Sequence, residues 1–85
     1  MTGGGQRFGV RVLYFASLRD AAGIDGESLP AQGDLRSLYQ GCRERHGFSL
    51  PVDRLRVAVD GAFAHWQDPV QPGTEIAFIP PVSGG

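Results

Sequence analysis

The sequence contains no lysine, and all eight of its basic residues are arginine. The chain therefore offers no side-chain amine on which an isopeptide bond could form. It also has a single cysteine, Cys42, which excludes an internal disulfide and a cysteine-based metal site. Cys42 falls on the apolar side of a predicted helix, where a thiol behaves as a small hydrophobic group. We therefore interpret Cys42 as a structural residue.

An excess of charge of one sign is also lacking. The formal net charge is −1 and the isoelectric point is about 6.0, so the chain has no basic field that would attract nucleic acid or an anionic membrane. No stretch approaches the ~20 apolar residues that a membrane span requires. Residues 1–7 have no apolar core of the kind found in signal peptides. We expect a reducing, cytoplasmic location.

The first strand is predicted from an alternating pattern in residues 8–15. Its buried side is expected to carry Phe8, Val10, Val12 and Tyr14, and its outer side Gly9, Arg11, Leu13 and Phe15. Further strands are predicted at 26–29, 56–59, 62–64 and 75–79. Asp60 and Gly61 form a hairpin signal between two of these strands.

One good helix is predicted after Asp34, which is a favourable N-cap residue. Apolar residues then recur at the spacing of one helix face, at Leu35, Leu38, Tyr39 and Cys42. Gly47 is expected to end this helix, and Gly23 to end a turn or two of helix over residues 16–22.

This order of elements predicts an α+β fold of the β-grasp, or ubiquitin-like, type. The expected domain is a mixed sheet of four to five strands packed on one main helix. We divide the chain into a flexible glycine-rich leader (1–7), the β-grasp domain (8–79) and an extended tail (80–85).

The tail is the part of the sequence that suggests a function. Pro80 and Pro81 end the last strand and favour an extended backbone, and the chain stops at Gly84 and Gly85. Because glycine has no Cβ, such an end can enter a channel too narrow for other residues. It can then present its terminal carboxylate to the active site of another protein.

Three stretches resemble the MoaD-type sulfur carriers, the small subunits of molybdopterin synthase in the MoaD/ThiS ubiquitin-like family. These are residues 12–20 (VLYFASLRD), 57–61 (VAVDG) and 72–85 (PGTEIAFIPPVSGG). The last stretch is the most specific, and the resemblance as a whole covers residues 8–85.

The resemblance implies a cycle of sulfur transfer that centres on Gly85. An E1-like, MoeB-type enzyme would use ATP to adenylate the Gly85 carboxylate, and a sulfur donor would convert it to a thiocarboxylate. The charged carrier would then insert its tail, including Gly84, into a MoaE-type large subunit. There it would donate sulfur to cyclic pyranopterin monophosphate, so the chain is expected to work in a hetero-oligomer.

The resemblance also implies which residues contact these partners. They are Phe15, Arg19, Phe63, Ile79, Pro80, Pro81, Val82 and Ser83, with Arg19 matching an arginine that contacts the activating enzyme. The alternation of the strands separately places Phe15 and Ile79 on the outer side of the sheet, and an exposed apolar patch usually marks an interface.

No catalytic machinery of its own is predicted for this chain. His46 and His65 are interpreted as surface or capping residues, and Asp60, Asp68 and Glu75 as carboxylates of turns and rims. We expect no metal site and no bound cofactor. Residues 3–5 follow no strand and open no helix, so they do not form a phosphate-binding loop. ATP is therefore assigned to the activating partner.

Other functions remain open at this point. The chain could carry sulfur for thiamine, cysteine or tRNA thiolation, although its closing stretch favours molybdopterin. It could be a ubiquitin-like protein modifier, or a β-grasp interaction module whose glycine end has no role. A single extra residue after Gly85 would abolish sulfur transfer to any of these acceptors and protein modification, and would leave the function of a plain interaction module unchanged.

Overall fold

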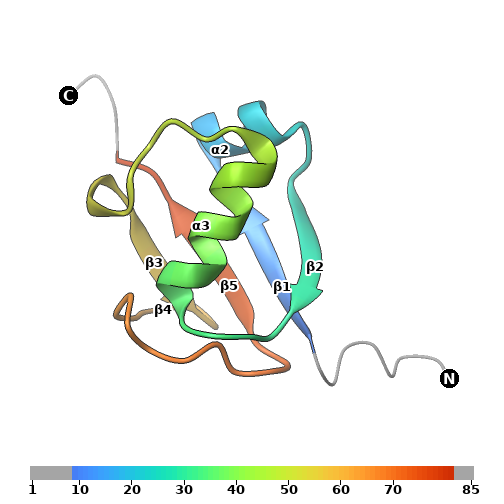
Figure 1. Ribbon diagram of the computed structural model, residues 1–85, viewed down its shortest axis with the longest axis vertical. Helices are drawn as coiled ribbons and strands as arrows, with labels where there is room; N and C mark the ends of the chain where they lie inside the picture. Colours follow the sequence, from blue (N-terminus) through green and yellow to red (C-terminus); the bar gives the residue numbers. More distant parts are fainter. Residues whose placement is uncertain (1–8, 82–85) are drawn as a thin grey trace, which may run out of the picture.

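The computed structural model describes residues 9–81, which form one five-stranded sheet with a helix packed on one of its faces (Figure 1). The elements in chain order are β1 (Gly9–Tyr14), α2 (Ala16–Ala22), β2 (Gly26–Pro30), α3 (Leu35–His46), the 3₁₀ helix η1 (Val52–Arg54), β3 (Arg56–Val59), β4 (Ala62–Phe63) and β5 (Glu75–Ile79). The strand order is β2-β1-β5-β3-β4.

The central strand β5 runs parallel to its neighbour β1, and the other neighbouring strands pair antiparallel. The sheet is therefore mixed, and the single long helix, α3, crosses one of its faces (Figure 1). This arrangement confirms the predicted β-grasp fold.

The ends of α3 follow the predicted chemistry. Asp34 accepts a hydrogen bond from the Ser37 amide at 2.8 Å, which satisfies one of the free amides at the helix N-terminus. Gly47 follows the last helical residue with φ of 74°, a left-handed conformation that glycine adopts at little cost. Gly23 ends α2 in the same way, with φ of 76°.

Two local predictions were inaccurate. The strand predicted at 62–64 comprises only Ala62–Phe63. The 3₁₀ helix η1 was not predicted, because a single turn of three residues is too short to show a periodic pattern. Val52 anchors this turn in the core with 3% of its surface exposed.

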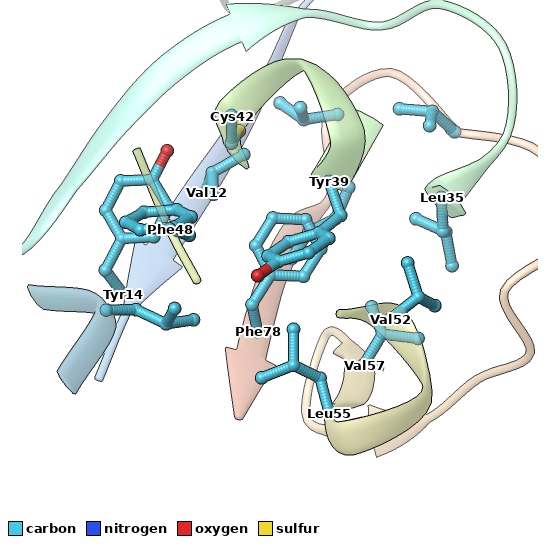
Figure 2. Close-up of a cluster of buried hydrophobic side chains, with 14 residues drawn as sticks. Val12, Tyr14, Leu35, Tyr39, Cys42, Phe48, Val52, Leu55, Val57 and Phe78 are labelled. Carbon is cyan, nitrogen blue, oxygen red and sulfur yellow. The ribbon is translucent and has the colours of Figure 1, made fainter. Parts of the chain in front are cut away.

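The core lies between α3 and the inner face of the sheet and is rich in aromatic side chains (Figure 2). Tyr39 meets Phe78 edge to face with ring centroids 5.1 Å apart, and its hydroxyl donates to the Leu50 carbonyl at 2.6 Å. Cys42 is fully buried in the same core cluster, as the sequence predicts. Burial raises the pKa of its thiol.

A carboxylate at the rim of the core joins β2 to β1 and α3. Glu27 lies opposite Val12 in the register and therefore points toward the helix. One of its oxygens accepts from the Tyr14 hydroxyl at 2.5 Å and from Arg45 at 2.9 Å, and it lies 2.7 Å from His46 Nε2.

The interpretation of His46 as a surface or capping residue was therefore wrong. Its side chain is only 15% exposed, and its ring packs against Tyr14 and Phe48 with centroid distances of 5.5 and 5.4 Å. The cause is Glu27, whose position on the inner side of β2 gives the imidazole a partner at the end of α3.

Candidate functional site

The candidate site begins where the chain leaves the sheet. Because β1 and β5 are parallel neighbours, their carboxyl ends lie at the same edge, with Tyr14 opposite Phe78. Phe15 continues β1 in an extended conformation, with φ of −126° and ψ of 151°. It therefore lies alongside Ile79, the last residue of β5.

The side of the sheet turned away from α3, here called the outer face, carries a row of apolar side chains. The register aligns Leu13 with Ala77, Ala77 with Ala58, and Ala58 with Phe63. Phe63 is 67% exposed and Phe15 is 43% exposed. The predicted outward positions of Phe15 and Leu13 agree with this alignment.

The backbone holds Phe15 in place on this face. Its carbonyl accepts hydrogen bonds from the amides of Leu18 and Arg19 at 3.0 and 3.5 Å, and the side chain of Leu18, which belongs to α2, is buried. The next residue, Ala16, has φ of 51°, a left-handed conformation that is unfavourable for a residue with a Cβ. The chain therefore turns sharply directly after Phe15.

The remaining predicted contact residues are placed as follows. Arg19 is exposed on α2, Ile79 and Pro80 are half-buried, and Pro81 is exposed. Val82, Ser83, Gly84 and Gly85 lie outside the described residues. The structure thus brings Phe15 and Ile79 together and places Phe63 on the same face, while the contacts of each with a partner stay predictions.

Neither a metal site nor a membrane helix is found in the part of the chain that the structure describes. Residues 9–81 contain no group of three or more histidine, cysteine, aspartate or glutamate side chains that could hold a metal. None of the described helices has the length and apolar character needed to cross a membrane. His65 is exposed, and its amide donates to Asp68 at 3.1 Å in a local turn.

The hollows on the described surface include the following two. One, of about 290 Å³, lies between β2 and α3 and is lined by Leu29, Pro30, Gln32, Gly33, Ser37, Leu38, Gly41, Cys42 and Arg45. The other, of about 220 Å³, lies at the β3–β4 edge and is lined by Leu55, Arg56, Val57, Phe63, Ala64 and Trp66. The second hollow borders the outer face, and sequence reasoning did not anticipate Arg56 beside Phe63.

Comparison with known proteins identifies the family. The model of the ThiS family matches residues 12–85, which include the last three residues of β1, all of β5 and residues 80–85. The chain belongs to the ThiS family. Within it, the molybdopterin synthase sulfur carrier subunit of Escherichia coli K12 is 31% identical over 80 residues, covering 89% of this chain and 99% of that protein. The human protein of the same name is 33% identical over 82 residues, covering 89% and 93%.

Solved structures agree with this ThiS-family assignment. A Pyrococcus furiosus protein provisionally named molybdopterin converting factor subunit 1 superposes with a TM-score of 0.73 at 32% identity, covering 87% of this chain and 98% of the other. SAMP1 from Haloferax volcanii gives 0.74 at 23% identity, covering 91% and 99%. A complex of subunits 1 and 2 of the molybdopterin-converting factor from Helicobacter pylori gives 0.65 at 23% identity, covering 91% and 99%. The last two likenesses show the shared fold.

Proposed function

We propose that this ThiS-family chain is the sulfur carrier subunit of a molybdopterin synthase and that Gly85 carries the sulfur. The observation that carries the proposal is the end of β5. Ile79 lies beside the exposed Phe15 on an apolar face, and the chain continues from there through a proline pair to Gly84 and Gly85. The proposed docking surface and the start of the tail are thus joined at one edge of the sheet.

The chemistry at Gly85 requires an activating partner. A carboxylate is a poor electrophile, so an E1-like, MoeB-type enzyme transfers AMP from ATP to it and releases pyrophosphate. Sulfide, or a persulfide whose S–S bond a second thiol then reduces, attacks the acyl carbon, AMP leaves, and a thiocarboxylate remains. Its sulfur is anionic and soft, which makes it a good nucleophile at neutral pH by the logic that applies to thiolates.

The described residues leave the chemical work to these partners. Cys42, the chain's single thiol, is buried in the core. The carboxylate Glu27 is occupied by Tyr14, Arg45 and His46. We therefore assign ATP binding to the activating enzyme, and sulfur transfer to cyclic pyranopterin monophosphate to the MoaE-type large subunit.

The outer face is the proposed docking surface for the large subunit. Phe63 and Phe15 expose large apolar areas, and a patch of this kind is typical of protein interfaces. The Helicobacter pylori neighbour is named as a complex of two subunits, which supports a hetero-oligomer of this type. Ile79 and Pro80 then carry the tail from the docking surface toward the active site of the partner.

A second function, protein modification, is favoured by one observation. SAMP1 from Haloferax volcanii shares the fold, and the solved neighbours include proteins named as small archaeal modifier proteins. A modifier would use the same activated Gly85 to acylate an amine of another protein. Carriers for thiamine, cysteine or tRNA thiolation share the first steps and differ only in the acceptor.

Deletion of Gly85 tests the proposal. The variant should keep the fold, because the sheet and core are complete within the described residues, and it should give no molybdopterin in a reconstituted synthase assay. Circular dichroism provides the folding control. A deletion variant that still supports molybdopterin formation would refute the proposed role of Gly85.

A further inference from the structure

Arg56 stands at the tail end of the outer face. It is the first residue of β3 and lies opposite Ile79 on β5. Since Arg56 and Ala58 are two residues apart on one strand, their side chains point to the same side of the sheet. The side chain of Arg56 is thus exposed on the surface that we propose for docking.

An aromatic ring holds the Arg56 side chain in this position. Its guanidinium carbon lies over the ring of Phe63, 5.3 Å from the ring centroid. A contact of this geometry stabilises the cation through the negative face of the aromatic ring. Both residues also line the hollow of about 220 Å³ at the β3–β4 edge, so the cation borders a space that a partner side chain can enter.

No carboxylate among the described residues forms an ion pair with Arg56. Within residues 9–81, the ion pairs formed are those of Glu27 with Arg45 and His46, and neither involves Arg56. Elsewhere on the outer face, Arg11 and Glu75 lie opposite each other in the register, at the start of β5. At the tail end, where Phe15 and Ile79 lie, Arg56 supplies a charge within an apolar surface.

Covering this surface has a consequence for Arg56. Removing a guanidinium from water is strongly unfavourable unless a hydrogen-bond acceptor of the partner replaces the lost hydration. A partner surface that is entirely apolar at this point would therefore bind less tightly. Arginine also matches a carboxylate geometrically, because its planar fork donates two parallel hydrogen bonds.

We propose that Arg56 is a charged anchor of the docking surface, which pairs with an acidic side chain of the large subunit seated in the hollow beside Phe63. The proposal rests on the proposed function, since it names the chemistry by which the same face selects its partner. The apolar residues supply contact area, and Arg56 supplies the specificity, because a partner without the acid leaves a buried charge unpaired.

The test is a binding titration of the full chain with the large synthase subunit from the same organism, at low and high salt. Arg56→Gln keeps a long side chain with hydrogen-bond donors and removes the charge. It should weaken binding by about tenfold or more and reduce the salt dependence. Arg56→Glu should weaken binding further, since it places like charges together. Arg36→Gln, on the exposed side of α3, is the matched control and should bind as the wild type does.

The outcomes separate the two proposals. If the wild type binds and Arg56→Gln binds equally well, with the same salt dependence, the anchor is refuted while the docking surface stands. If the wild type shows no binding to the large subunit, the proposed function fails and the anchor fails with it. Thermal unfolding serves as the folding control. The Arg56 variants should unfold at the temperature of the wild type, because the Arg56 side chain lies outside the core cluster.

Discussion

Phe15 and Ile79 are 64 residues apart in the chain and lie side by side, because β1 and β5 pair in parallel with Tyr14 opposite Phe78. The first of these residues is an exposed aromatic, and the second immediately precedes the proline pair of the tail. Any protein that covers Phe15 therefore also holds the point from which the tail departs. The proposed function depends on this relationship.

Phe15→Arg should weaken binding to the large subunit by about tenfold or more, since aromatic residues at the centre of an interface are frequent hot spots. The helix content should not change, because Phe15 does not belong to the core cluster. Titration calorimetry and circular dichroism measure the two effects. Ser37→Arg, on the exposed side of α3, is the control for added charge. An unchanged affinity for Phe15→Arg would contradict the role of the outer face.

Substitutions at Ala16 should change the stability of the fold, because this residue has a left-handed backbone conformation. Its φ of 51° costs a residue with a Cβ about 1–2 kcal/mol. Ala16→Gly should therefore leave the free energy of unfolding unchanged or raise it by up to about 1 kcal/mol, after the entropy that glycine gains in the unfolded chain. Ala16→Val should lower it by at least about 1 kcal/mol. Urea unfolding of both variants decides the matter, and a valine variant as stable as the wild type would rule out the strain.

Glu27 should make the fold sensitive to acid. Burial raises the pKa of its carboxyl group, but hydrogen bonds from Tyr14, His46 and Arg45 outweigh burial and lower the pKa from 4.5 to about 2. The folded state therefore binds the proton less readily than the unfolded state. The resulting stabilisation, about 1–3 kcal/mol, is present above pH 4.5 and is lost as the pH falls toward 2.

Glu27→Gln should remove this part of the pH dependence and lower the stability at neutral pH. The measurement is the free energy of unfolding between pH 2 and pH 7, with Glu44→Gln as the control because Glu44 is exposed on α3. Parallel pH profiles for the wild type and Glu27→Gln would show that the carboxylate does not act in this way.

Most of the fold could be predicted from the sequence, because its signals are local. The alternation of residues 8–15 gave both the strand and the outward position of Phe15, and Asp34 and Gly47 marked the ends of α3. Each of these features depends on residues within a few positions of one another. The ThiS-family assignment rested on the specific closing stretch and was confirmed by the family match.

The features that were missed depend on distant residues or on an unusual backbone. Glu27 and His46 are 19 residues apart, and no local pattern joins them. Likewise, Arg56 reaches Phe63 only because the Asp60–Gly61 turn folds β4 back onto β3. The left-handed conformation of Ala16 carries no sequence signal, since alanine ordinarily favours right-handed helix. Such features require the three-dimensional arrangement.

The most direct test of the account is the intact mass of the protein after incubation with the activating enzyme of its host, ATP and a sulfur donor. We predict a mass gain equal to the replacement of one oxygen by sulfur, dependent on ATP and absent when Gly85 is deleted. No gain, or ligation of the chain to other proteins in place of it, would contradict the assignment of this chain as a sulfur carrier.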